Sequence, residues 1–279
     1  MAGKILILGA TGNVGKPLVA ELVAKGEPVR AASRFGKAVA GAEGVRFDFA
    51  DSATFGPALE GVDRAYVLAP TGTLDTVGTL LPFLKVAAER KVKIVLQSVF
   101  GVDADDSIPY RQVELFLERS GTPFVILRPN WFTDNFQLFW LEGIKQGVIS
   151  VPAGQGKSSF IDVRDIAASA AAALTSSRFD GQAFNLTGPE ALSYSEASAI
   201  LSKASGRAIA YKPATDAEFV ATLVGAGVPK AYAEFLALIF HPVREGWTAA
   251  ISNAVQTLTG RAPRSVEAYA KENAGAFAA

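Results

Sequence analysis

The 279-residue sequence predicts an α/β protein in which a doubly wound parallel sheet is followed by a smaller, mostly helical part. Three observations predict this class. Short apolar segments typical of buried strands alternate with helix-like segments through the first half of the chain. A glycine-rich turn joins the first of these strands to a helix. From Ser193 onward the pattern changes to helices separated by glycine and proline.

The first strand and the turn after it are the most specific local signal. The residues from Ile5 to Leu8 are all apolar, which suits a strand buried on both faces of a parallel sheet. An amphipathic helix is expected over 13–25. The turn between them has the sequence Gly9-Ala10-Thr11-Gly12-Asn13-Val14-Gly15. Because glycine has no Cβ, backbone N–H groups and the helix N-terminus can approach a pyrophosphate closely here.

The spacing of this turn, G-x-x-G-x-x-G, differs from the commoner G-x-G-x-x-G, and a glycine-rich turn can also be no more than a turn. Its place between a buried strand and an amphipathic helix favours dinucleotide binding. The residues predicted to bind the cofactor in this turn are Gly9, Thr11, Gly12, Asn13, Val14 and Gly15.

The second strand, expected over 28–32, ends where the adenosine ribose of the cofactor is expected. An acidic residue there would accept a hydrogen bond from the 2′-hydroxyl of NAD, but this sequence has Ser33 and Arg34, with Lys37 nearby. A hydroxyl and a guanidinium would bind a 2′-phosphate, which a carboxylate would repel. The alternative is that Arg34 is a solvated loop charge. We predict NADP as the cofactor, with NADPH preferred over NADH.

Further strands are expected over 45–49, 64–69, 92–97, 124–127 and 183–186, with helices over 74–90, 110–120 and 164–175. These βαβ units predict a doubly wound sheet, in which ligands lie at the carboxyl ends of the strands. Asp48 could contact the adenine amine, although a capping or turn role fits its position equally well. The predicted cofactor contacts at the strand ends are Ser33, Arg34, Asp48, Ala69, Pro70, Ser98, Pro129 and Asn130.

An aromatic segment follows the strand expected over 124–127. Aromatic residues at helical spacing are more often core than substrate contacts, but these follow a strand end at the predicted crevice. The predicted substrate contacts are Phe100, Trp131, Phe132 and Phe136. Helices expected over 193–205, 215–225, 229–240, 248–259 and 265–273 should form a lobe over the crevice. In this lobe His241 could touch substrate, but a packing or surface role is expected.

Composition excludes several classes of protein. Lys+Arg and Asp+Glu are both 27, so the net charge is zero, which argues against a broad nucleic-acid footprint. With no cysteine and one histidine, neither disulfides nor a Cys/His metal site is possible, and no metal is expected. No apolar run is long enough to span a bilayer. We expect a cytoplasmic protein that acts on a small-molecule substrate, without a nucleic-acid or membrane partner.

Taken together, these motifs resemble the NmrA-like, atypical branch of the short-chain dehydrogenase/reductases. Within that branch the sequence is most similar to the NADPH-dependent quinone oxidoreductase and triphenylmethane reductase group. The matching segments are the glycine turn, 120–132, 160–167, 185–190 and 258–264. The resemblance implies a Rossmann-type NAD(P)-binding domain over 1–188, with substrate-lobe insertions around 131–160, and a substrate-binding lobe over 189–279. It also implies that the nicotinamide lies near Pro129 to Phe132.

One departure from the superfamily bears on mechanism. Most members use a Tyr-x-x-x-Lys pair, in which the lysine lowers the tyrosine pKa so that the phenol can protonate a carbonyl oxygen. Here Glu114 stands four residues after Tyr110, and no lysine lies between Lys93 and Lys145. Tyr110 is therefore a weak catalytic candidate, and the catalytic residues stay unassigned. The same absence disfavours a sugar-nucleotide epimerase or dehydratase.

Two functions fit this pattern. The first is an NADPH-dependent reductase that transfers hydride to a quinone-like or electrophilic aromatic or imine acceptor, which needs no protein acid. The second is a redox-sensing regulator of the NmrA type, which binds NADP(H) without turnover. The aromatic cluster after the sixth strand favours the enzyme, because a sensor has no need of a second pocket beside the nicotinamide.

Overall fold

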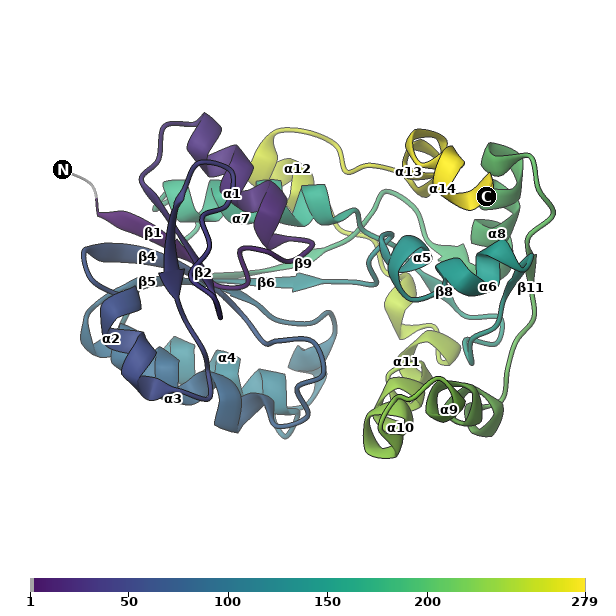
Figure 1. Ribbon diagram of the computed structural model, residues 1–279, viewed down its shortest axis with the longest axis horizontal. Helices are drawn as coiled ribbons and strands as arrows, with labels where there is room; N and C mark the ends of the chain where they lie inside the picture. Colours follow the sequence, from purple (N-terminus) through teal and green to yellow (C-terminus); the bar gives the residue numbers. More distant parts are fainter. Residues whose placement is uncertain (1–2, 279) are drawn as a thin grey trace. The chain divides into compact units, whose positions relative to one another are not determined.

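Figure 1 shows the computed structural model of the protein, which describes residues 3–278. Contacts between Cα atoms divide it into two compact units. Unit 1 runs to Pro129 and includes Val163–Leu186 and Ala254–Arg261, and unit 2 holds Asn130–Asp162, Thr187–Asn253 and the chain from Ala262 onward. The expected division at residue 188 stays a prediction. The contacts differ from it in one respect, because 254–261 lie with unit 1.

Unit 1 is built on a seven-stranded sheet with the order β3-β2-β1-β4-β5-β6-β9. All neighbouring strands are parallel. The strands are β1 Lys4–Ile7, β2 Val29–Ser33, β3 Glu43–Arg46, β4 Val62–Leu68, β5 Lys93–Gln97, β6 Phe124–Pro129 and β9 Gln182–Leu186. The chain runs from β1 outward to β3 and then returns to β4, so the strand order reverses between β1 and β4. Ligands of such sheets lie outside the carboxyl ends of the strands at this point.

Helices cover both faces of the sheet in unit 1 (Figure 1). One layer holds α1 Gly15–Ala24, α7 Val163–Thr175 and α12 Ala254–Thr259, and the other holds α2 Phe55–Ala58, α3 Thr76–Glu89 and α4 Pro109–Arg119. Short 3-10 helices, η1 Ser52–Thr54 and η2 Val102–Ala104, lie in the loops. Leu6 and Leu8 pack with Phe83 in the core that α3 and α4 cover. Because both faces are covered, β1 is apolar at consecutive positions instead of alternating. The predicted fold class is confirmed.

Unit 2 is mostly helical, as expected for the smaller lobe. Its helices are α5 Asn135–Leu138, α6 Leu141–Lys145, α8 Tyr194–Ser205, α9 Asp216–Gly225, α10 Lys230–Leu238, α11 His241–Arg244, α13 Val266–Glu272 and α14 Ala274–Ala278. Two small sheets pair β8 Lys157–Ser158 with β10 Leu192–Ser193, and β7 Val148–Ile149 with β11 Ala210–Tyr211. Capping boxes begin α8 at Ser193 and α9 at Thr215, with Glu196 and Glu218 as their reciprocal acceptors.

Two predicted elements differ from the structure. The strand expected over 45–49 is β3, Glu43–Arg46, because its ladder with β2 ends there and Phe47 turns into the core. The helix expected over 248–259 begins only at Ala254, after the 3-10 helix η3, Trp247–Ala249. Between them the backbone bonds to distant segments of unit 2: Ser252 N–H donates to Thr187 Oγ1 and Ala250 C=O accepts from Ser159 Oγ. Over residues 3–278, every helix is too short or too polar to cross a membrane.

Candidate functional site

The glycine turn after β1 is built around a close approach of helix α1 to the backbone. Gly9 has φ +64°, a left-handed conformation that favours glycine. A Cβ on Gly15 would lie 2.1 Å from Gly9 O and 2.8 Å from Ala10 Cα, so no larger residue fits this position. The N–H of Gly12 donates to Gly9 C=O at 2.8 Å and closes the turn. Gly9 and Gly15 therefore have structural reasons to be glycine.

The N-terminus of α1 is open toward solvent. Thr11, Gly12 and Asn13 are exposed, and Val14 is buried at the N-cap without a side-chain hydrogen bond to the helix. The first turn of α1 carries no acidic residue. Its first N–H groups and the positive end of its dipole are therefore not compensated by a local side chain. Together with the glycines, this makes a cradle suited to an anionic group.

The end of β2 forms a second part of the candidate site. Ser33 C=O accepts from Gly36 N–H at 3.1 Å, and Ser33 Oγ accepts from Lys37 N–H at 3.3 Å. Arg34 is exposed, and its guanidinium has no carboxylate partner among residues 3–278. The chain thus places an unpaired cation where the sheet order predicts the ribose. The next residue, Phe35, was not predicted; its 80% exposure is the signal that identifies it.

Asp48 lies two residues beyond the end of β3. Its carboxylate accepts from Ala50 N–H at 3.0 Å, and its C=O accepts from Asp51 N–H at 3.0 Å. These bonds are those of a turn residue. The structure thus gives Asp48 the turn role that the sequence left open, and an additional contact with adenine stays a prediction.

The ends of β4, β5 and β6 place further predicted residues at the same edge of the sheet. Ala69 and Pro70 follow β4 directly, and Pro129 ends β6. Ser98 follows β5 and is 2% exposed; its N–H donates to Leu127 C=O at 2.8 Å, but its Oγ has no hydrogen-bond partner in the described structure. A buried hydroxyl without a partner is destabilising, and such groups often mark ligand sites. This is the strongest local support for Ser98.

Helix α4 places an acid, not a lysine, four residues after Tyr110. Glu114 is fully buried and accepts two hydrogen bonds from Arg128, from Nε at 2.9 Å and Nη2 at 2.7 Å. Arg111 Nη1 donates to the same carboxylate at 3.0 Å, and Arg128 Nη1 donates to Asp103 at 2.6 Å. The sequence analysis missed this network, although an arginine at a strand end and a glutamate on a helix face are its visible parts.

Two phenols lie near each other below the strand ends of unit 1. Tyr66 is completely buried and its hydroxyl donates to Gln97 Oε1. Burial raises the pKa of Tyr66 far above its ordinary value, and the nearby Tyr110 raises it further. A phenol with a raised pKa is a poor proton donor near neutral pH. Tyr66 therefore does not replace the missing acid.

The predicted aromatic substrate contacts are divided between the units. Phe100 is half-buried in unit 1, where its N–H donates to Pro129 C=O at 3.1 Å. Trp131 is half-buried in unit 2 and packs on Phe240, with ring centroids 4.6 Å apart. Phe132, also half-buried, pairs with Ile161 in an isolated β-bridge. Phe136 is completely buried, so a contact with substrate would require its neighbours to move.

Asn130 is held by unit 2. Its amide nitrogen donates to Ser159 Oγ and to Thr248 C=O, both at 2.8 Å, and its Oδ1 accepts from Trp131 N–H at 2.9 Å. These bonds explain why a buried asparagine is stable here. His241 is a surface residue, 3.8 Å from Glu245 and edge-on to Trp247, in agreement with the expected surface role.

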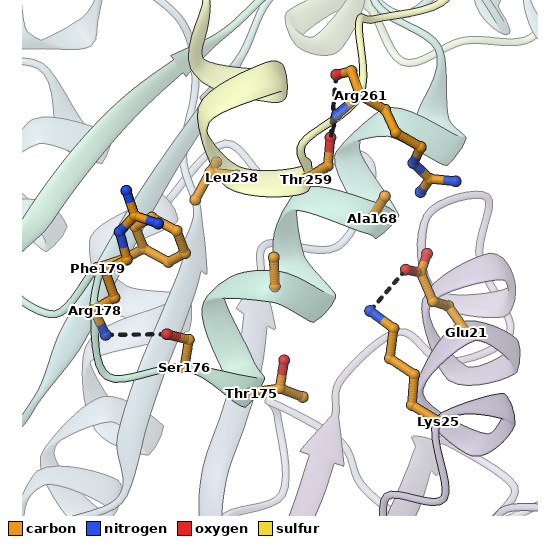
Figure 2. Close-up of a pocket in the computed structure, with 11 residues that line it drawn as sticks. Glu21, Lys25, Ala168, Thr175, Ser176, Arg178, Phe179, Leu258, Thr259 and Arg261 are labelled. Atoms are coloured by element: carbon orange, nitrogen blue, oxygen red, sulfur yellow. Dashed lines mark hydrogen bonds and ion pairs between the residues drawn. The ribbon is translucent and has the colours of Figure 1, made fainter.

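A hollow of about 540 Å³ lies elsewhere on unit 1 (Figure 2). Lys25, which pairs with Glu21 at 3.1 Å, follows the C-terminal end of α1, whereas the glycine turn precedes its N-terminal end. None of the predicted site residues lines the hollow. The structure therefore separates it from the candidate site. Among residues 3–278, no group of three or more acidic or histidine side chains could hold a metal ion.

Comparisons with known proteins agree with the resemblance. The chain is 36% identical to an uncharacterized oxidoreductase of Bacillus subtilis, over 97% of this chain and 95% of that protein. It is 35% identical to the prestalk A differentiation protein A of Dictyostelium discoideum, with 96% and 91% covered. An NAD(P)H azoreductase of Xenophilus azovorans is 30% identical, with 99% of each chain covered.

Two solved structures share the fold. The NADPH-dependent quinone oxidoreductase of Escherichia coli, in complex with NADPH, has a TM-score of 0.84 at 24% identity and covers 96% of this chain and 99% of its own. The triphenylmethane reductase of Citrobacter sp. has a TM-score of 0.81 at 24% identity, with 97% and 99% covered. The model of the NmrA-like family matches residues 1–270. The chain therefore belongs to the NmrA-like family.

Proposed function

We propose that this protein is an NADPH-dependent reductase that transfers hydride to a quinone-like or otherwise electrophilic aromatic or imine small molecule. The observation that carries the proposal is the cradle after β1, where Gly15 lets an uncompensated helix N-terminus pack directly against Gly9. The relatives named as an azoreductase and a quinone oxidoreductase support the same class of reaction.

The residues of unit 1 fit a dinucleotide phosphate. The glycine turn would hold the pyrophosphate through backbone N–H groups, and Arg34, which has no carboxylate partner within 3–278, would bind a 2′-phosphate. Ser98 carries a buried hydroxyl that a bound cofactor or substrate could satisfy. When bound, NADPH supplies a hydride from its nicotinamide ring. The protein supplies orientation of that ring and exclusion of water.

The network around Glu114 selects the class of acceptor. With two arginines donating to it, Glu114 is held as an anion and cannot lower the pKa of Tyr110 as a lysine would. A ketone, which develops an alkoxide as it accepts hydride, is therefore a poor substrate. A quinone yields a stabilised hydroquinone anion, and an iminium or a triarylmethane dye is already cationic. These acceptors take the hydride without an internal acid, and protons come from solvent.

A second candidate is an NADP(H)-binding redox sensor of the NmrA type, which acts through a partner protein without turnover. One relative of similar identity is named for a differentiation process and not for a reaction. The absent Tyr-Lys pair is compatible with this function too. The unpaired Ser98 hydroxyl does not separate the two candidates, because a bound cofactor alone could satisfy it.

Loss of NADPH absorbance, measured with a panel of quinones, azo and triarylmethane dyes and imines, tests the proposal. We expect turnover with acceptors of these classes and little with simple ketones. Binding of NADPH without turnover of any acceptor would favour the sensor. If neither NADPH nor NADP associates with the protein in calorimetry, both candidates are wrong.

A further inference from the structure

The turn at the end of β2 carries an aromatic ring that is almost fully exposed. Phe35 is 80% exposed, more than any other large hydrophobic residue in the described part of the chain. It has no aromatic neighbour among residues 3–278. A single exposed hydrophobic residue needs no explanation in itself. The position of Phe35 and the rigidity of its backbone give its exposure a meaning.

The backbone of this turn is fixed at both ends. Ser33 C=O accepts from Gly36 N–H at 3.1 Å, which places Arg34 and Phe35 at the two central positions of a β-turn. Ser33 C=O also accepts from Phe47 N–H at 2.9 Å, which ties the base of the turn to the chain after β3. The two central side chains therefore extend from a rigid support.

Two glycines let this turn lie directly against β3. Gly36 has φ +63°, and a Cβ there would be 3.1 Å from Arg46 N. A Cβ on Gly44 would be 2.2 Å from Gly36 O, closer than any side chain could approach. The close packing holds the backbone of the turn against the sheet. A ring carried at its tip is consequently presented to a ligand and not to the core.

We propose that Phe35 is a stacking platform for the adenine base of the bound dinucleotide. This inference rests on the proposed function, in which Arg34 binds the 2′-phosphate. Adenine is attached to the ribose that carries this phosphate, so the side chain next to Arg34 is close to the base. Aromatic side chains stack on the π-face of a base whatever its hydrogen-bonding edge. Arg34 thus supplies the preference for NADPH over NADH, and Phe35 supplies affinity common to both.

Calorimetry with 2′,5′-ADP tests this division, because that probe contains the adenine and the 2′-phosphate but no nicotinamide. Phe35→Ala is expected to weaken 2′,5′-ADP, NADPH and NADH by the same factor, about tenfold. Arg34→Ala is expected to weaken 2′,5′-ADP and NADPH strongly and NADH little. The matched control is Phe139→Ala, which removes another exposed phenylalanine, 67% exposed and in unit 2, and should leave 2′,5′-ADP binding unchanged.

A fluorescence experiment separates stacking from a general effect on the turn. Phe35→Trp keeps an aromatic ring at the position, so it should bind 2′,5′-ADP at least as tightly as the natural protein. The added tryptophan emission should be quenched by 2′,5′-ADP, because the base lies on the ring. Unchanged affinity of Phe35→Ala for 2′,5′-ADP would overturn the stacking role and leave the reductase proposal standing. If the natural protein binds neither 2′,5′-ADP nor NADPH, both proposals fail.

Discussion

At the scale of single residues, the glycine turn separates two roles that look identical in the sequence. Gly15 is buried against backbone, and a Cβ there would lie only 2.1 Å from Gly9 O. Gly12 is exposed, and a Cβ there would meet Gly9 O at 3.1 Å and nothing else nearby. Gly15 is therefore required by the fold, whereas Gly12 is required by the proposed ligand.

This difference predicts opposite outcomes for two substitutions. Gly15→Ala should lower the free energy of unfolding by about 1–3 kcal/mol, because α1 must move away from the turn. Gly12→Val should change stability much less but abolish NADPH binding, because its side chain enters the path of the pyrophosphate. Urea denaturation followed by far-UV circular dichroism, together with calorimetry, measures both. Gly225→Ala, at the open end of α9, is the control for stability. Equal effects of Gly12→Val and Gly15→Ala on stability would contradict the assignment.

The residues that sequence could identify are those whose backbone imposes a requirement. Gly9 and Gly15 belong to a spacing with a steric cause, and Ser33 and Arg34 follow a strand whose end could be located. The unpaired hydroxyl of Ser98 and the exposed ring of Phe35 could not be predicted, because pairing and exposure depend on tertiary packing. The same applies to Asn130, whose buried amide serves three contacts within unit 2.

At the scale of elements, the ion-pair network joins α4 to the end of β6 and to η2. Arg128 uses three nitrogens, two on Glu114 and one on Asp103. Ser98 and Phe100 lie in the segment between β5 and η2, which also donates backbone hydrogen bonds to Leu127 and Pro129. The segment is thus held along β6 by backbone bonds and by one ion pair.

Glu114→Gln is expected to destabilise the protein by about 3–5 kcal/mol, because it leaves two guanidinium groups facing a neutral amide in a buried site. Far-UV circular dichroism in urea is the appropriate measurement, since all three tryptophans lie in unit 2 and would report on that unit. Asp106→Asn is the control: it also removes a carboxylate partner of an arginine, but Asp106 is 72% exposed and the loss should be about 0–1 kcal/mol. Similar losses for the two variants would show that Glu114 carries no special weight.

Elements were predicted well where a long periodic pattern was present and poorly where backbone groups bonded elsewhere. The helices α3, α7 and α8 lie within two residues of their expected ends. The helix expected from residue 248 is interrupted because the backbone at Ala250 and Ser252 bonds to distant residues of unit 2. The two-residue strands β7, β8, β10 and β11 have no period that a sequence could display.

At the scale of the whole molecule, the parallel sheet and its strand order follow from alternating strands and helices together with the rule of right-handed crossovers. The edge of the sheet that carries the site follows from the same reasoning. The grouping of 254–261 with unit 1 does not, because a late segment that packs beside α7 has the same pattern as any amphipathic helix. Long-range pairing of this kind depends on shape complementarity that one sequence does not display.

The ionisable groups of the protein set a pH window for its stability. A backbone N–H of Ser193 and the ammonium of Lys157 lower the pKa of Glu196, and Lys4 lowers that of Glu43. A lowered folded-state pKa contributes stability that is present above the unfolded value, about 4.3, and is lost as pH falls through the folded value. Burial raises the pKa of Tyr66 and Tyr194, so their contribution is present below about pH 10 and is lost as pH rises further.

The alkaline side of this window can be tested at one residue. The hydroxyl of Tyr194 is buried in the aromatic core of unit 2 without a hydrogen-bond partner in the described structure, so its removal breaks no bond. Tyr194→Phe should therefore be as stable as the natural protein at pH 7 or more stable, and its free energy of unfolding should fall less between pH 9 and pH 11. Urea denaturation at several pH values measures both effects. A loss above about 1 kcal/mol at pH 7 would mean that the hydroxyl is bonded, because a net hydrogen bond contributes about that amount.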